Sequence, residues 1–293
     1  MRRLSFETLD VFTTQPLEGN PLAVLPDARG LTDGEMLSIA REFNLSETSF
    51  VIRRDESTER GCGIRTRIFT TREEMPFAGH PTLGTAAVLR GLGAGDDLAL
   101  ELNVGRVPVR FTERGGRAFG EMVQVDPTFG RVHDRARVAE AIGAPATELD
   151  GSLPIQTVST GNPVAIVPFL RLSTLQSWAP DWRRMEAYFQ GSDARFFYAI
   201  CRETVALDAD LHARMVFYGG DDPATGSAAG PAVAWLVEHG LVAAGASVEI
   251  EQGLEVHRAS RIFARADLAG KKVTNVRVGG FFAPVLRGEI CLP

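Results

Sequence analysis

Two short motifs recur in this sequence at one fixed spacing, and this repeat restricts the possible folds more than any other feature. Gly19–Pro26 (GNPLAVLP) resembles Gly161–Pro168 (GNPVAIVP), and His80–Ala87 (HPTLGTAA) resembles Asp222–Ala229 (DPATGSAA). Both pairs are separated by 142 residues (19 to 161, and 80 to 222). Because two unrelated motifs share one offset, we predict two homologous halves.

The repeat predicts a first half over residues 1–128 and a second half over residues 129–293. A chain of 293 residues fits two domains of this size. The last segment, 271–293, has no counterpart in the first half. It reads as strands, and it is a candidate to close against the first half.

Each half mixes strand and helix signals. Thr32–Glu35 is a capping-box signature followed by apolar residues at helical spacing, and Asn44 is a suitable helix end. The stretches Val107–Phe111 and Ala118–Val125 flank Arg114–Arg117, whose two glycines predict a hairpin. Strands dominate, so the expected class is α+β.

Each copy of the second motif places a polar residue and a proline before a run of glycine and alanine. Proline suits the first helical turn, and Asp222 is a favourable N-cap, whereas His80 at the matching position is not. Glycine inside a helix costs about 1 kcal/mol relative to alanine, so Gly84 and Gly230 indicate helices enclosed too tightly for side chains. A helix start also offers free N–H groups to an anion.

Composition excludes several classes of partner. The net charge is −6 and no Lys/Arg-rich run occurs, which argues against nucleic-acid binding. The longest nearly apolar run, Ala228–Val237, is about half as long as a membrane span, so no membrane association is expected. The three cysteines, Cys62, Cys201 and Cys291, are odd in number and unpatterned, which suits a reducing cytoplasm.

The sequence also lacks cofactor motifs. The only lysines are Lys271 and Lys272, adjacent in a polar turn, which disfavours a lysine-bound pyridoxal group. The histidines show no metal-ligand spacing. Gly91–Gly95 follows a helix and not a strand, so it is a poor dinucleotide fingerprint. We therefore expect no metal and no cofactor.

Several stretches, in this order along almost the whole chain, resemble the PhzF-like family of phenazine-biosynthesis isomerases. They are Pro16–Val24, Ile39–Thr48, Pro76–Thr85, Asp222–Ala228 and Gln252–Val256 followed by Arg258–Arg261. The resemblance implies a diaminopimelate-epimerase-like fold: two pseudo-symmetric halves, each a curled, barrel-like mixed sheet around a central helix, with the active site between them. It also implies cofactor-independent isomerisation of a dihydro-hydroxyanthranilate and a homodimer.

The resemblance assigns site residues as well. It implies that the catalytic glutamate is Glu47, the active-site histidine His80 and the active-site aspartate Asp222. Ser227 also matches the family motif. Beside these, Gly79, Gly226, Ser227 and Asn20 are the candidate substrate-binding residues. The backbone N–H groups of Gly226 and Ser227 would receive the substrate carboxylate.

Glu47 has no counterpart in the second half, where the matching position is Phe189. Moving a proton between carbons of a small carboxylate requires one group that is base first and acid afterwards. A buried glutamate, with its pKa raised from about 4.3 towards neutrality, suits that double role. His80 would hydrogen-bond the substrate, and Asp222 would hold an amino group or orient His80.

Two alternatives remain open at this point. A two-base epimerase or racemase of the same fold needs one cysteine from each half, but Cys62 matches Thr204 and neither motif contains cysteine. A non-catalytic protein that binds a small carboxylate is the other alternative, and the intact Glu47 argues against it.

Overall fold

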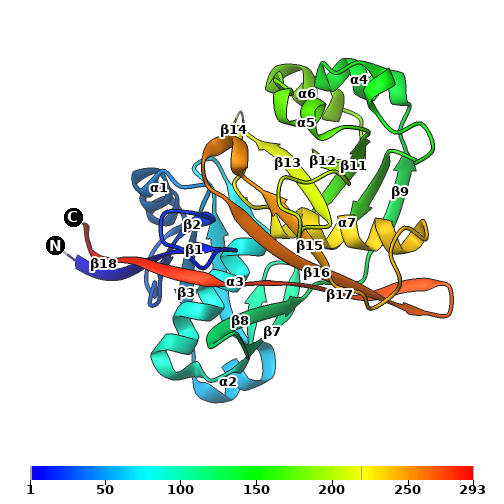
Figure 1. The fold of residues 1–293 in the computed structure, drawn as a ribbon. Helices are drawn as coiled ribbons and strands as arrows, with labels where there is room; N and C mark the ends of the chain where they lie inside the picture. Colours follow the sequence, from blue (N-terminus) through cyan, green and yellow to red (C-terminus); the bar gives the residue numbers. More distant parts are fainter. Residues whose placement is uncertain (1, 219, 293) are drawn as a thin grey trace. The chain divides into compact units, whose positions relative to one another are not determined.

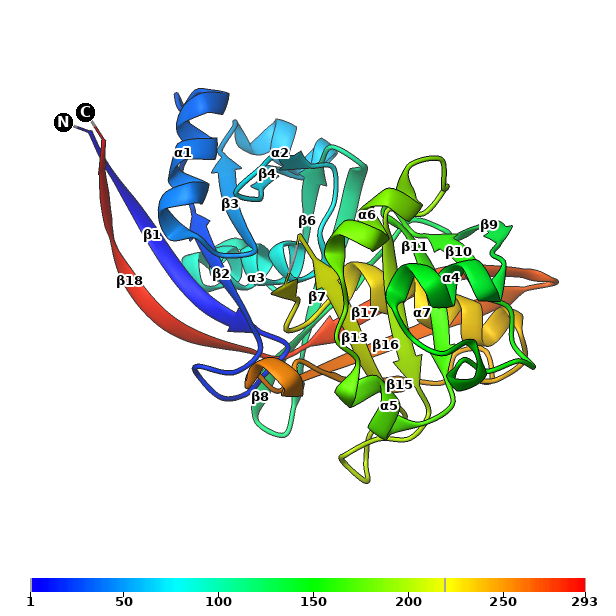
Figure 2. The ribbon, with the colours of Figure 1, turned by 90° about the horizontal axis from the view of Figure 1, so that it is seen from above.

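The computed structural model describes residues 2–218 and 220–292 of the chain. It divides into two compact units, Met1–Val123 with Gly279–Pro293 (unit 1) and Gln124–Val278 (unit 2). Figures 1 and 2 show the course of the chain through the strands and helices of each unit. No helix among the described residues is long and apolar enough to cross a membrane.

Unit 1 is a mixed sheet with one buried helix. Its order of pairing is β18–β1–β2–β3–β4–β6–β7–β8, in which β2–β3 and β4–β6 are parallel, the other pairs are antiparallel, and β5 pairs with β4. The strands are β1 (Arg2–Val11), β2 (Asn20–Leu25), β3 (Glu47–Ile52), β4 (Ile64–Phe69), β5 (Glu74–Met75), β6 (Asp97–Leu102), β7 (Gly105–Arg114), β8 (Arg117–Val123) and β18 (Phe282–Leu292).

The predicted local signals of unit 1 are confirmed. Helix α1 (Asp33–Phe43) begins with a capping box, in which Glu35 N–H donates to Thr32 Oγ1 and Thr32 N–H donates to Glu35 Oε2 at 2.8 Å. It ends at Asn44 in the left-handed conformation, and β7 and β8 form the hairpin. The helix packs on Leu25 and Phe50, and α2 (Glu56–Cys62) follows β3.

Helix α3 (Gly79–Leu89) lies inside the curl of the unit 1 sheet. Every one of its residues is buried, and it packs against β1, β2, β3, β6 and β8. A Cβ on Gly84 would lie 2.6 Å from Leu22 Cδ2 and 2.9 Å from Val11 Cγ2. Because those two residues are themselves fully buried, they have little room to move. The glycine is therefore required by the sheet that surrounds the helix.

Unit 2 has the same order of pairing. Its strands follow the order β10–β11–β12–β13–β15–β16. In this series β11–β12 and β13–β15 are parallel and the other pairs are antiparallel, as in the corresponding strands β1 to β7 of unit 1. Strand β9 flanks β10 as β18 flanks β1, and β14 pairs with β13. The strands are β9 (Thr128–Val132), β10 (Gln156–Ser159), β11 (Pro163–Phe169), β12 (Phe196–Cys201), β13 (Leu211–Phe217), β14 (Gly220–Asp221), β15 (Val248–Gln252), β16 (Ser260–Ala269) and β17 (Lys272–Gly280).

Helix α7 (Gly226–Glu238) is the counterpart of α3. Only its last residue is not buried, and it packs against β10, β11 and β16. A Cβ on Gly230 would lie 1.9 Å from Gln124 Oε1. That amide is held in place, because it accepts from Thr160 Oγ1 and donates to the Gly226 carbonyl oxygen. The expected fold class, two pseudo-symmetric halves with curled mixed sheets around central helices, is confirmed.

Three further helices build a second core in unit 2. These helices are α4 (Arg135–Ile142), α5 (Leu172–Ser177) and α6 (Trp182–Phe189). Residues of all three belong to one cluster of buried and partly buried side chains, which includes Val138, Leu175, Trp178 and Met185. The segment around α6, which carries no motif, therefore has a packing role.

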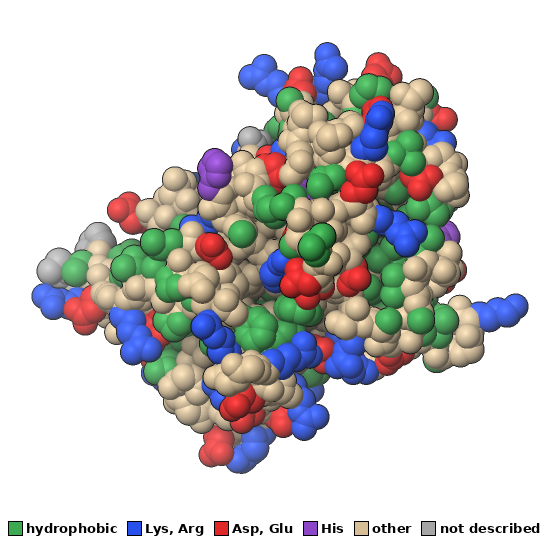
Figure 3. Space-filling model, viewed as in Figure 1, with side chains coloured by type: hydrophobic (Ala, Val, Ile, Leu, Met, Phe, Trp, Pro, Cys, Tyr) green, Lys and Arg blue, Asp and Glu red, His purple; other side chains and the backbone are tan. Residues whose placement is uncertain are grey.

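Charged side chains of both signs alternate over the face shown in Figure 3. Several form exposed ion pairs, for example Arg60 with Glu56 at 2.6 Å. Exposed pairs of this kind contribute about 0–1 kcal/mol each. The stability of the units therefore depends mainly on their buried apolar cores.

We predict that Gly84→Ala destabilises the protein although alanine is the better helix former. Overpacking against Leu22 and Val11 should cost about 1–3 kcal/mol, more than the gain of about 1 kcal/mol in helix propensity. The control is Gly34→Ala in α1, where a Cβ meets nothing within 4 Å, and this variant should be as stable as the parent or more so. Urea unfolding followed by circular dichroism measures both. A Gly84→Ala protein as stable as the parent would contradict the close packing.

Candidate active site

Glu47 is the first residue of β3, just beyond the end of α1. The left-handed turn at Asn44 ends the helix and directs the chain into the strand three residues later. The parallel ladder pairs Glu47 with Leu22, and the glutamate is only 6% exposed. A carboxylate at this position is thus held by a regular strand in the interior of unit 1.

His80 is the second residue of α3, and it meets Glu47. Its Nε2 lies 3.5 Å from Glu47 Oε2, and the imidazole is 3% exposed. The distance is longer than an ordinary hydrogen bond, and among the described residues Nε2 has no hydrogen-bond partner. The structure therefore brings together the expected glutamate and histidine.

Burial determines the charge of His80. Desolvation lowers its pKa to about 3, so the ring is neutral at pH 7. A neutral imidazole has one N–H donor and one acceptor nitrogen. It can therefore donate to or accept from a bound molecule without placing a positive charge beside Glu47.

Asn20 and Gly79 belong to the same part of unit 1. Since β2 and β3 run parallel and begin at Asn20 and Glu47, both residues lie at the same edge of the sheet. Gly79 is the first residue of α3, directly before His80, and it is buried. These positions agree with the expected substrate contacts, whose role stays a prediction.

Ser49 was not singled out from the sequence. It lies two residues after Glu47 on β3, so both side chains point to the same face. The serine is fully buried, and its hydroxyl has no hydrogen-bond partner among the described residues. A buried hydroxyl without a partner is unfavourable in itself. Its position after the Asn-Leu-Ser-Glu stretch was the only available signal.

Asp222 is not the N-cap of α7, and this expectation was wrong. The helix begins at Gly226 after Thr225, so Asp222 lies in the loop before it. Thr225 Oγ1 donates to Asp222 Oδ2 at 2.6 Å, which closes the loop on itself. The repeated motifs thus match in sequence but not in where their helices start, because α3 already begins at Gly79.

Gln252 organises this loop, and sequence reasoning gave it no role. Its side-chain N–H groups donate to the Asp222 carbonyl oxygen at 2.7 Å and to Thr225 Oγ1 at 2.9 Å. Its carbonyl oxygen accepts from Thr225 N–H at 3.1 Å and from the Tyr198 hydroxyl at 3.2 Å. Every hydrogen-bonding group of the amide is used. Gln252 therefore fixes the loop against β15.

Two neighbours support this arrangement. A Cβ on Gly253 would lie 2.4 Å from the Pro223 carbonyl oxygen, so only glycine allows the loop to pass this closely. Burial, with the charge of Asp222 adding to it, raises the pKa of Tyr198. The tyrosine hydroxyl therefore stays protonated and donates a hydrogen bond to Gln252 Oε1.

The start of α7 has unused donors. Ala228 and Ala229 N–H both donate to the Thr225 carbonyl oxygen. Within the described part of the chain, no acceptor is recorded for the backbone N–H of Gly226 or Ser227, and both residues are buried. Free N–H groups at a helix start favour a carboxylate. This geometry agrees with the anion contact expected from the sequence.

His212 connects two strands next to this loop. Its Nδ1 lies 2.8 Å from Glu251 Oε1, and its Nε2 lies 2.9 Å from Glu255 Oε1. Burial disfavours the charged ring, but the hydrogen bonds that this ring donates to Glu255 and Glu251 outweigh it and raise the pKa of His212. No group of three or more metal-binding side chains with suitable geometry occurs among residues 2–218 and 220–292.

Comparison with solved structures identifies the fold. The chain aligns with a protein from Agrobacterium radiobacter described as a probable proline racemase, at a TM-score of 0.66 and 11% identity, covering 99% of this chain and 93% of that one. That likeness shows the fold alone. A phenazine biosynthesis protein of the PhzF family from Bacillus anthracis aligns at a TM-score of 0.86 and 30% identity over 100% of both chains.

The sequence comparison gives the family. The model of the phenazine biosynthesis-like protein family (PhzC-PhzF) matches residues 9–288, and the chain belongs to this family. The trans-2,3-dihydro-3-hydroxyanthranilate isomerase of Pseudomonas aeruginosa is 36% identical over 292 residues, which cover 98% of this chain and 99% of the relative. The chain is accordingly an isomerase of the PhzF type.

We predict that the pKa values of His80 and His212 are shifted in opposite directions, downwards for His80 and upwards for His212. His80 should stay neutral down to pH 5, and His212 should still be charged at pH 6.5. Because its folded-state pKa is raised, His212 stabilises the protein most below the unfolded value of about 6.5, and this contribution is lost as the pH rises through the folded pKa. Imidazole ¹⁵N spectra recorded against pH, assigned with single His→Gln variants, measure both. A His80 ring that gains its proton between pH 6 and 7 would contradict its enclosure.

Proposed function

We propose that this isomerase transfers a proton between two carbon atoms of a small carboxylate, with Glu47 as the acid/base group and no cofactor. The observation that carries the proposal is the buried pair of Glu47 and a neutral His80, 3.5 Å apart at the start of α3. A carboxylate can take a proton from one carbon and return it to another only if it stays close to both. Its strand position provides that fixed placement.

His80 assists as a neutral hydrogen-bonding group. Because its pKa is depressed to about 3, the ring is neutral and can accept a hydrogen bond without first losing a proton. It can stabilise the charge that develops on a substrate oxygen or nitrogen as Glu47 removes the proton. Asn20 and the backbone at Gly79 would contact the same molecule.

Asp222, Gly226 and Ser227 supply the groups that an amino carboxylate requires. The backbone N–H groups at the start of α7 would receive its carboxylate. Asp222, held by Gln252 and Thr225, would accept from its amino group. The relative from Pseudomonas aeruginosa is named for a substrate with both groups, a dihydro-hydroxyanthranilate. A molecule of this type is the proposed substrate class.

The cysteines do not support the epimerase alternative. Cys62 lies exposed in α2, Cys201 is buried in β12 and Cys291 is exposed in β18. None occupies the position of His80 in α3 or the matching position of Asp222 in the loop before α7. A one-base proton transfer through Glu47 is therefore favoured over a two-thiol mechanism.

We predict that Glu47→Gln loses turnover by about a hundred- to ten-thousand-fold, because glutamine keeps the shape but cannot accept a proton. Glu47→Asp should also lose about a hundredfold, since retraction by one methylene misplaces the carboxylate by more than about 1 Å. Incorporation of solvent deuterium into trans-2,3-dihydro-3-hydroxyanthranilate, followed by mass spectrometry, is the measurement.

The matched control for this experiment is Glu42→Gln, an exposed carboxylate near the end of α1, which should exchange at the parental rate. Exchange at the parental rate in Glu47→Gln would remove Glu47 from the mechanism. Substrate binding without any exchange in the parent protein would instead favour a binding function.

We predict a smaller effect for Ser227→Ala. The backbone N–H at this position remains, so the proposed carboxylate contact survives and the loss in kcat/KM should stay below about tenfold, or about 1.4 kcal/mol. Steady-state kinetics on the same substrate measure it. A loss as large as that of Glu47→Gln would show that the serine hydroxyl itself takes part in the reaction.

A further inference from the structure

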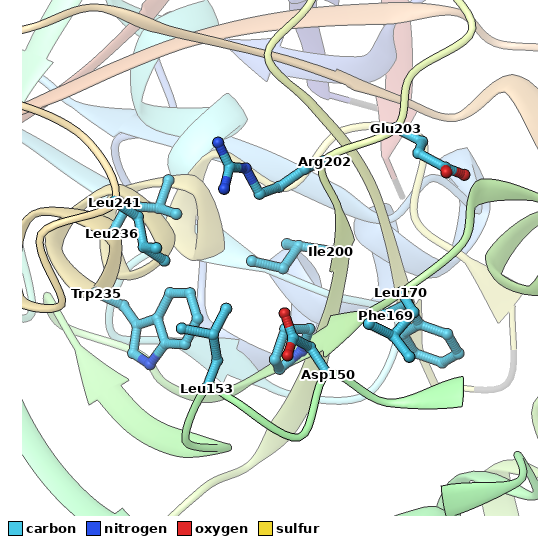
Figure 4. A pocket seen from close by; sticks show the side chains of 11 residues that line it. Asp150, Leu153, Phe169, Leu170, Ile200, Arg202, Glu203, Trp235, Leu236 and Leu241 are labelled. Carbon is cyan, nitrogen blue, oxygen red and sulfur yellow. The ribbon is translucent and has the colours of Figure 1, made fainter. Parts of the chain in front are cut away.

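A cavity lies in unit 2, away from the start of α7. It has a volume of about 360 Å³, within the range of small-molecule sites. Leu153, Ile200, Trp235, Leu236 and Leu241 give it an apolar lining, and Figure 4 shows these side chains around it. Trp235 follows Ser227 by eight residues of helix, roughly 12 Å along the axis. The cavity is therefore separate from the loop that holds Asp222.

Two charged groups at this cavity are accessible to a ligand. Arg202 is exposed, and its side chain forms no hydrogen bond or ion pair within the described part of unit 2. Asp150 uses Oδ1 to accept from Ser152 N–H at 2.9 Å and Oγ–H at 2.6 Å, whereas no contact is recorded for Oδ2 among these residues. In Figure 4 they lie on opposite sides of Ile200.

Glu203, the other acidic residue at the cavity, points away from it. Its Oε2 accepts from Leu172 N–H at 2.8 Å, and Figure 4 shows its carboxylate turned away from Ile200. The Arg202 guanidinium and the Asp150 carboxylate are therefore the charged groups nearest to the apolar lining. A ligand that satisfies both must carry both charges as well as an apolar body.

We propose that this cavity binds an α-amino acid with an apolar side chain. Its carboxylate would pair with Arg202, its ammonium group with Asp150, and its side chain would lie among Leu153, Trp235 and Leu236. A simple carboxylic acid would bring its apolar body towards the unmatched carboxylate of Asp150. A simple amine would leave Arg202 unmatched. Recognition of both charges is what distinguishes an amino acid from these analogues.

Calorimetric titration of the full chain tests the ligand class. L-leucine and L-phenylalanine should bind, whereas 4-methylpentanoate, 3-phenylpropanoate and 2-phenylethylamine should bind at least about tenfold more weakly, since each lacks one charged contact. Absence of saturable binding by either amino acid would overturn the proposal. Equal affinity for the amino acid and its des-amino analogue would overturn it as well.

Variants of the same chain locate the site. Arg202→Gln and Asp150→Asn should each weaken binding about ten- to hundredfold, and Leu153→Trp should abolish it by filling the pocket. The control is Arg183→Gln on α6, an exposed arginine away from the cavity, which should bind as the parent does. Circular dichroism confirms the fold of each variant. Unchanged affinity in both Arg202→Gln and Leu153→Trp would show that the amino acid binds elsewhere.

Discussion

The structure depends on the enclosure of two small-residue helices by curled sheets. A sheet can close around a helix only if the helix surface is nearly bare, and Gly84 and Gly230 provide that surface at their closest approaches to Leu22 and Gln124. The same enclosure buries the starts of both helices, together with His80 and Ser227. Packing density thus determines where polar groups can be isolated from water, and the candidate active site follows from it.

Isolation from water also decides how the Glu47–His80 pair can work. In water the imidazole would be partly charged near neutral pH, and it would form an ordinary ion pair with the glutamate. Inside unit 1 the ring stays neutral, so it does not form an ion pair with Glu47. In the proposed mechanism Glu47 would carry the proton, and the neutral His80 would provide a hydrogen bond. Burial achieves this division of labour without any additional charged residue.

The sequence predicted what depends on local chemistry and on repetition. The capping box at Thr32 and the hairpin at Gly115–Gly116 follow from short-range patterns, and the two halves follow from the repeated motifs. The curled sheets were expected from the family resemblance. The contact of Glu47 with His80 was expected only from the family resemblance. Gln252 could not be found, because its role depends on the path of a loop 30 residues earlier in the chain. The prediction of Asp222 as an N-cap failed for the same reason, because an aspartate suits both a helix N-cap and a loop closed by Thr225.

The pairing of β18 with β1 has a consequence for the order in which the molecule can form. Residues 282–292 lie against residues 2–11, so in the sheet of unit 1 strand β1 is synthesised long before the strand that flanks it. Unit 2 is one continuous stretch, Gln124–Val278. On a ribosome, the middle of this chain can therefore reach its native pairing before the beginning does, which reverses the usual N-terminal-first order. During that interval the edge of β1 that β18 later covers stays open, and its exposed charged residues Arg2 and Arg3 would limit pairing with other chains.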